Sequence, residues 1–172
     1  MSRTSTSGAQ VEVFSFSAPV TFGIPLIAIF LQAWLPLRLS WFSVLDLPLL
    51  VTIFFAMARR NPITGLLTGT FIGLFQDALT HQALGVYGIA KTVVGYGASS
   101  LGIRIDSENP GARMLLTLVF YVVHKSVYFL IAAGLVGQSL RWDWLHEISS
   151  AVANAIFGVL LYSLLDRFKR RI

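Results

Sequence analysis

The chain has 172 residues, of which 55% are hydrophobic and only 12% are charged, whereas a soluble domain carries about 25% charged residues. A mean hydropathy of +0.72 excludes an ordinary soluble fold, and the lack of cysteine excludes disulfides and thiolate metal sites. The net charge of +5 does not indicate nucleic-acid binding, because the basic residues stand at the ends of apolar segments, where they orient a chain in the bilayer.

Six apolar segments predict an all-α membrane helix bundle, because a bilayer core needs about 20 apolar residues per helix. The segments run over about 19–37, 41–58, 62–80, 84–102, 112–137 and 147–166. We expect them to form one transmembrane domain over 18–166, with a flexible N-terminal tail at 1–17 and a basic C-terminal tail at 167–172. A re-entrant hairpin in place of the second and third spans is the alternative.

The distribution of basic residues predicts that both termini are cytoplasmic. With six spans, this orientation leaves only Arg38 and Arg141 on the outer side. It places on the cytoplasmic side Arg3, Arg59, Arg60, Arg104, Arg113, Arg167, Lys169, Arg170 and Arg171. Such an excess is what the positive-inside rule requires. The Arg59–Arg60 loop and the basic tail either only set this topology or also contact anionic lipid or a cytoskeletal partner.

Glycines predict a close contact between the third and fourth segments. Gly65, Gly69 and Gly73 follow each other at steps of four on the third segment, and Gly88 and Gly95 stand on the fourth. In lipid, small residues of this kind let two helix backbones approach each other. We expect these glycines to pack the bundle, and they are also candidates for docking the transmembrane helix of a partner.

Four ionisable residues are predicted to lie within spans, where an uncompensated charge costs a few kcal/mol. Asp77 and Lys91 lie at similar depths on neighbouring segments, so we expect an ion pair; otherwise Asp77 is hydrated and Lys91 reaches toward the interface. Asp46 is expected to cap the second helix. Lys125 is expected to face the bundle, with Asp46 or Asp77 as its counter-ion, and His124 beside it to be hydrogen-bonded in place.

No constellation for catalysis is apparent. Asp77 and His81 have the i, i+4 spacing of two metal ligands, but no third ligand stands near them in the sequence. No Ser/His/Asp set and no phosphate-binding loop is found. We therefore expect neither an enzyme nor a metal or other cofactor.

One stretch resembles a known family. The segment GLLTGTFIGLFQDALTHQALGVYGIAKTVVGYGASSLG, residues 65–102, is similar to the signature region of the MreD family, a small integral membrane subunit of the bacterial rod-shape machinery. The matching pattern is a glycine-spaced helix that ends at Asp77, a turn at Leu84-Gly85, and a helix with Val94-Gly95-Tyr96. The size, the number of predicted spans and the basic tail fit as well.

The resemblance implies a non-catalytic scaffold of the elongation complex in the bacterial inner membrane. Its partners would be the bitopic protein MreC and, in a larger complex, MreB, RodA and a class B penicillin-binding protein, which together direct lateral peptidoglycan synthesis. It also implies a fold like that of the substrate-binding S-components of ECF vitamin transporters.

A transport subunit of that S-component type is the alternative function. Such a subunit needs a cavity lined by convergent polar groups and small residues on its first helix for docking to the energising unit. The first span, PVTFGIPLIAIFLQAW, has no Ala-x-x-x-Ala pattern, which argues against this alternative.

Overall fold

The computed structural model describes residues 14–103, 109–140 and 142–171. The described residues form six α-helices, so the predicted all-α bundle is confirmed. The helices are α1 (Ala18–Trp34), α2 (Leu47–Arg59), α3 (Pro62–Leu79), α4 (Val86–Gly102), α5 (Pro110–Gly134) and α6 (Trp144–Leu165). Three 3₁₀ turns, η1 (Leu35–Leu37), η2 (Ser40–Val44) and η3 (Asp166–Phe168), and two short strands, β1 (Phe14–Ser15) and β2 (Arg170–Arg171), complete the fold.

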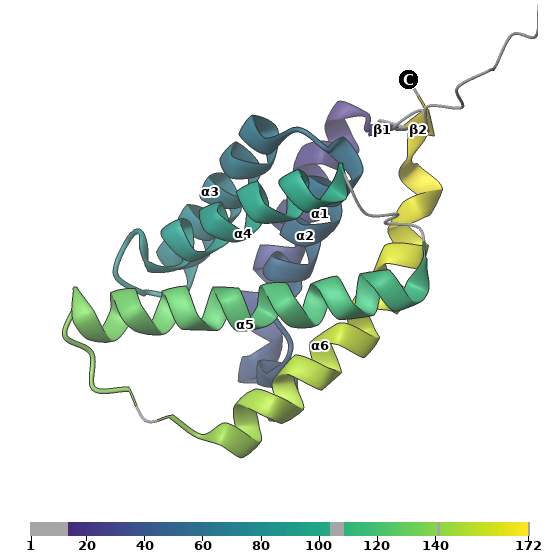
Figure 1. Ribbon diagram of the computed structural model, residues 1–172. Coiled ribbons are helices and arrows are strands. Elements are labelled where there is room, and N and C mark those ends of the chain that lie inside the picture. The colour runs from purple at the N-terminus through teal and green to yellow at the C-terminus, as the bar shows by residue number, and fades with distance from the viewer. Residues whose placement is uncertain (1–13, 104–108, 141, 172) are drawn as a thin grey trace, which may run out of the picture.

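The short helix α2 lies at the centre of the bundle. Every residue from Leu47 to Ala58 is buried, and α2 contacts each of the other five helices. Figure 1 shows α3 and α4 running side by side, with α5 lying across α4 and α6 packed along α5. The core therefore forms around α2 rather than between two layers of equal helices.

Three of the helical segments in the described part of the chain are long and apolar enough to cross a membrane. They are Ala18–Leu37, Pro110–Gly134 and Trp144–Phe168. Helix α2 is apolar but has only 13 residues, which corresponds to a length of about 20 Å. A hydrocarbon core is about 30 Å thick, so α2 is too short to span it. The other helices surround α2, because every residue from Leu47 to Ala58 is buried.

The start of α2 differs from the sequence-based expectation. The span was expected from residue 41, but the chain first forms the 3₁₀ turn η2 and the helix begins at Leu47. Asp46 is the N-cap residue, and its Oδ1 accepts a hydrogen bond from the backbone N–H of Leu49 at 2.9 Å. Pro48 occupies the first turn, where its missing N–H costs nothing. The predicted capping role of Asp46 is confirmed.

The two ends of the described chain lie together. β1 pairs antiparallel with β2, with Phe14 opposite Arg171 (Figure 1). Part of the N-terminal tail that was expected to be flexible therefore belongs to the fold, because Phe14 is buried and Nζ of Lys169 lies 4.6 Å from the centre of its ring. Residues 1–13, and with them Arg3, as well as Arg104 and Arg141, lie outside the described residues.

Glycines bring the backbones of α3 and α4 into direct contact. A Cβ atom on Gly69 would collide with the carbonyl of Lys91, and one on Gly73 would lie 2.6 Å from Cα of Gly88. A Cβ atom on Gly65 would likewise collide with the carbonyl oxygen of Gly95, and one on Gly95 with the carbonyl oxygen of Gly65. The glycine faces of α3 and α4 are thus occupied by each other. A partner helix would therefore have to dock on a different face of α3 or α4, and such docking remains a proposal.

Replacing Gly69 with alanine is expected to destabilise the α3–α4 contact, because the obstructing atoms belong to backbone and cannot rotate away. Overpacking of this kind costs about 1–3 kcal/mol. The melting temperature of the purified protein in detergent should therefore fall. The matched control is Gly134→Ala at the end of α5, where nothing lies within 4 Å of the added Cβ. Equal melting temperatures for the two variants would contradict this close contact.

Candidate functional site

A polar cluster surrounds the start of α2 and joins it to α4. Oδ2 of Asp46 lies 3.0 Å from Nζ of Lys91. The Lys91 side chain is fully buried, although it stands on a helix whose neighbouring positions are apolar or small. A buried ammonium group is tolerated only when it is paired and hydrogen-bonded. The carboxylate at the start of α2 supplies that partner.

Helix α5 completes the cluster through His124. Nε2 of His124 lies 3.2 Å from Nζ of Lys91, and its Nδ1 lies 3.8 Å from Oδ2 of Asp46. Because an ammonium group can only donate, Nε2 accepts this hydrogen bond. The ring of Tyr87 stacks on that of His124 with a centroid distance of 5.9 Å, and Nζ of Lys91 lies 4.9 Å from the Tyr87 centroid. The expectation that His124 is hydrogen-bonded in place is confirmed.

Two amide side chains satisfy the backbone where the chain turns into α2. Gln32 of α1 donates to the carbonyl of Leu45 at 2.9 Å and accepts from the N–H of Leu47 at 3.0 Å. Asn154 of α6 accepts from the N–H of Asp46 at 2.8 Å. Neither Gln32 nor Asn154 was predicted from the sequence to have a role. The available signal was a lone carboxamide within an otherwise apolar helix, which must find partners in a bundle core.

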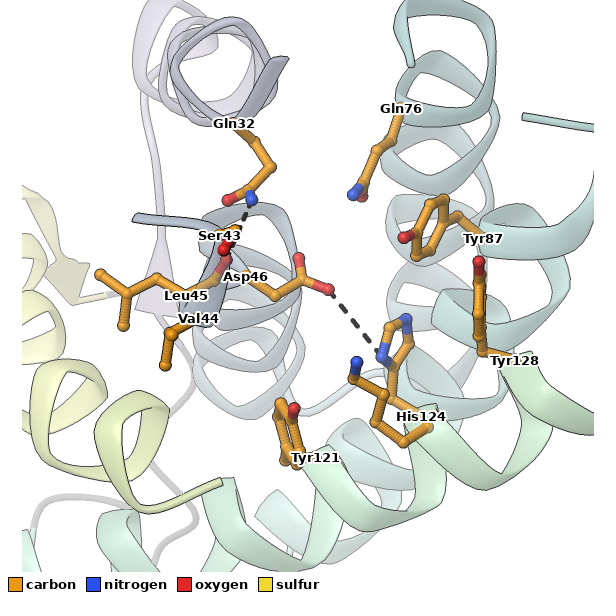
Figure 2. Close-up of a pocket in the computed structure, with 11 residues that line it drawn as sticks. Gln32, Ser43, Val44, Leu45, Asp46, Gln76, Tyr87, Tyr121, His124 and Tyr128 are labelled. Carbon is orange, nitrogen blue, oxygen red and sulfur yellow. Dashed lines mark hydrogen bonds and ion pairs between the residues drawn. The ribbon is translucent and has the colours of Figure 1, made fainter. Parts of the chain in front are cut away.

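A small polar cavity lies beside this cluster, and Figure 2 shows Asp46, Gln76 and His124 at three different sides of it. Within the described part of the chain, Oε1 of Gln76 and Nδ1 of His124 are buried without a hydrogen-bond partner. The cavity holds about 70 Å³, which is room for a few water molecules. Sites for small organic ligands measure about 300–1,000 Å³, so this cavity does not fit a vitamin.

The expected ion pair between Asp77 and Lys91 is wrong. Asp77 instead accepts hydrogen bonds from the backbone N–H groups of Gly85, Tyr87 and Gly88 at 2.8, 3.0 and 3.1 Å. The first turn of a helix leaves its N–H groups without internal partners, and the short turn after α3 brings the carboxylate onto those of α4. The expected similar depth is wrong as well: Lys91 lies beside Gly69, about 12 Å along α3 from Asp77, and its side chain reaches α2.

The counter-ion expected for Lys125 is also wrong. Its Nζ lies 3.1 Å from Oε1 of Glu147, and the hydroxyl of Tyr121 donates to the other carboxylate oxygen at 3.0 Å. Helix α6 begins at Trp144, before the expected position 147. Glu147 therefore lies in the first turn of α6, where it reaches α5.

The basic residues expected at the cytoplasmic face differ in their contacts. Nη2 of Arg59 donates to Oγ1 of Thr21 at 2.7 Å, and Lys169 pairs with Asp166 at 2.8 Å. Arg60 ends α2 in the left-handed conformation with φ of 51°. The side chain of Arg167 is exposed, whereas Arg170 and Arg171 enter β2 through their backbones.

The fold and the cluster together define an integral membrane helix bundle whose internal charges are neutralised by one another. A family model described as "rod shape-determining protein MreD" matches residues 14–172, nearly the whole chain. The chain therefore belongs to the MreD family, a family of non-enzymatic, shape-determining membrane proteins that associate within the rod-shape complex.

More distant similarity extends to longer proteins. The chain is 29% identical over 151 residues to "Protein TsgA homolog" from Enterobacter sp. (strain 638), which covers 86% of this chain and 35% of that protein. It is 28% identical over 151 residues to "Protein TsgA" from Salmonella typhimurium (strain LT2), with the same coverage of each. The chain thus spans about a third of the length of these relatives. No solved structure matches it, so the S-component-like fold stays a prediction.

Removing one member of the Asp46–Lys91 pair leaves the other charge buried. We expect Lys91→Met and Asp46→Asn each to lower the free energy of unfolding by about 3–5 kcal/mol. The double variant should recover much of this loss, because neither charge is then left alone. A double-mutant cycle measured by unfolding in detergent gives the coupling. The control is a cycle between Asp77 and Lys91, and equally strong coupling there would restore the pairing that the sequence suggested.

Replacing Asp77 with alanine should leave the three N–H groups at the start of α4 without an acceptor. Each unsatisfied buried group costs about 1–3 kcal/mol, so the melting temperature should fall. Asp77→Asn, which keeps one oxygen, should give an intermediate value. The control is Asp143→Ala, because Asp143 caps α6 at an exposed position. A loss no larger than that of the control would count against the role of Asp77.

Proposed function

We propose that this protein is a non-catalytic scaffold of the bacterial elongation complex, which binds MreC and helps to direct lateral peptidoglycan synthesis. The observation that carries the proposal is the match of the MreD family model over residues 14–172. In this proposal the chain resides in the inner membrane with both termini in the cytoplasm, and it assembles with RodA, a class B penicillin-binding protein and MreB.

The contacts of the buried charges support a scaffolding role. Asp46 and Lys91 bind each other, and Lys125 binds Glu147. These groups fix helices to one another, and the cavity beside them is too small for an organic substrate. The outward faces of the helices are instead apolar, with exposed side chains such as those of Phe71, Tyr96, Val122 and Leu160. Such faces suit contact with lipid or with the transmembrane helix of a partner.

The basic residues at the end where β1 and β2 meet are proposed to face the cytoplasm. The exposed Arg167 is available there for contact with anionic lipid or with the cytoskeletal partner. Lys169 is already bound to Asp166, so its contribution is to hold the tail in place. Arg59 lies near this end too, where its guanidinium stands over the ring of Phe16 and its Nη2 donates to Thr21.

Depletion of the protein in its native rod-shaped bacterium tests the proposed function. We expect cells to lose their rod shape and become round, and the wild-type gene to restore rods. Cells that remain rods after depletion would overturn the proposal. The control is a matched depletion with a complementing copy expressed throughout.

Photo-crosslinking tests the partner. A photoreactive residue is placed at the exposed position Phe71, Tyr96, Val122 or Leu160, one on each of four helices. We expect crosslinks to MreC from one helix face and not from the others. Crosslinks to MreC from no position on any helix would contradict direct binding through the membrane, and tight binding of a vitamin by the purified protein would support the transport alternative instead.

A further inference from the structure

An apolar groove runs along the outside of the bundle between α1 and α3. Its volume is about 480 Å³. Its walls are formed by aromatic and aliphatic side chains, namely Phe22, Leu26, Ile29, Leu67, Phe71 and Phe75. Several of these side chains are half or more exposed, including Phe22 and Phe71 at 68% and 62%. The groove therefore opens sideways, toward the surroundings of the bundle, and not toward the polar cavity.

One end of the groove is polar and positively charged. Arg59, at the end of α2, lines it together with Thr21 and Thr64. Only one hydrogen bond from the Arg59 guanidinium is found within the described part of the chain, from Nη2 to Thr21 at 2.7 Å. A guanidinium with free donors is the side chain best suited to bind a phosphate group.

The dimensions of the groove favour a hydrocarbon chain over a helix. From Thr64 to Phe75 the groove follows α3 through eleven steps of about 1.5 Å each, a length of about 16 Å. Dividing about 480 Å³ by this length gives a mean cross-section of about 30 Å². A helix with side chains is about 10–12 Å across, so a partner helix would lie over the groove and not within it.

We propose that this groove is a phospholipid site, in which one acyl chain lies between α1 and α3 and the phosphate of an anionic phospholipid binds Arg59. The charge at one end and the apolar walls beyond it match the two parts of such a molecule. A zwitterionic lipid fits less well, because its ammonium group would lie close to the positive charge of Arg59. The site lies toward the end of the bundle where β1 and β2 meet, so the lipid belongs to the leaflet on that side. The proposal does not depend on the role in cell shape.

Native mass spectrometry of the full chain, purified in detergent and titrated with lipid, tests the site. The probes are phosphatidylglycerol and phosphatidylethanolamine with identical acyl chains. We expect phosphatidylglycerol to bind more tightly. Arg59→Gln should weaken its binding about tenfold, which is the loss of one charge-assisted hydrogen bond. Thr68→Phe, which places a ring in the groove, should weaken the binding of both lipids.

Two matched variants serve as controls. Arg38→Gln removes an exposed positive charge beyond the other end of α1, and Val93→Phe adds a ring on the exposed face of α4. Neither should change lipid affinity, and the melting temperature of each variant shows that it is folded. Lipid affinity that is unchanged in Arg59→Gln or in Thr68→Phe would overturn the proposal. Crosslinking of a photoreactive residue at Leu67 only to a protein helix in native membranes would overturn it too.

Discussion

The ion pair between Asp46 and Lys91 is the interaction on which the arrangement of helices depends. Helix α2 begins inside the bundle, and a helix start carries unsatisfied N–H groups and a partial positive charge. Asp46 satisfies one of these N–H groups and at the same time neutralises the ammonium group of α4. His124, Gln32 and Asn154 add contacts from α5, α1 and α6. The polar start of one short helix thus joins five of the six helices.

The glycine contact and the ion pair support each other. Gly65, Gly69 and Gly73 allow α4 to lie directly against α3, and Asp77 fixes the first turn of α4 through three hydrogen bonds. Together they determine both the distance and the rotation of α4. That rotation turns Lys91 away from α3 and toward Asp46. Close packing at glycines therefore determines which neighbouring helix the charge of Lys91 meets.

The helices could be predicted from the sequence, whereas the partners of the buried charged residues could not. Hydropathy and glycine spacing predicted six helices and the close pair α3 and α4, because both signals are local. The partner of Lys91 was missed because a count of residues from the turn does not show which residues of two packed helices lie side by side. Lys91 lies beside Gly69, about two turns from Asp77. The partner of Lys125 was missed because Glu147 reaches α5 only when α6 begins at Trp144. The pairing of β1 with β2 involves two residues on each side, too few for a sequence pattern.

The buried position of α2 has a consequence for how the protein is made. During synthesis the helices leave the ribosome in chain order, from α1 to α6. Helix α2 is too short to span the hydrocarbon core, and Asp46 receives its counter-ion only when α4 has followed. His124 and Asn154 arrive later still. The polar contacts at the start of α2 are therefore complete only after α6 has been synthesised, so the first half of the chain reaches its final arrangement late.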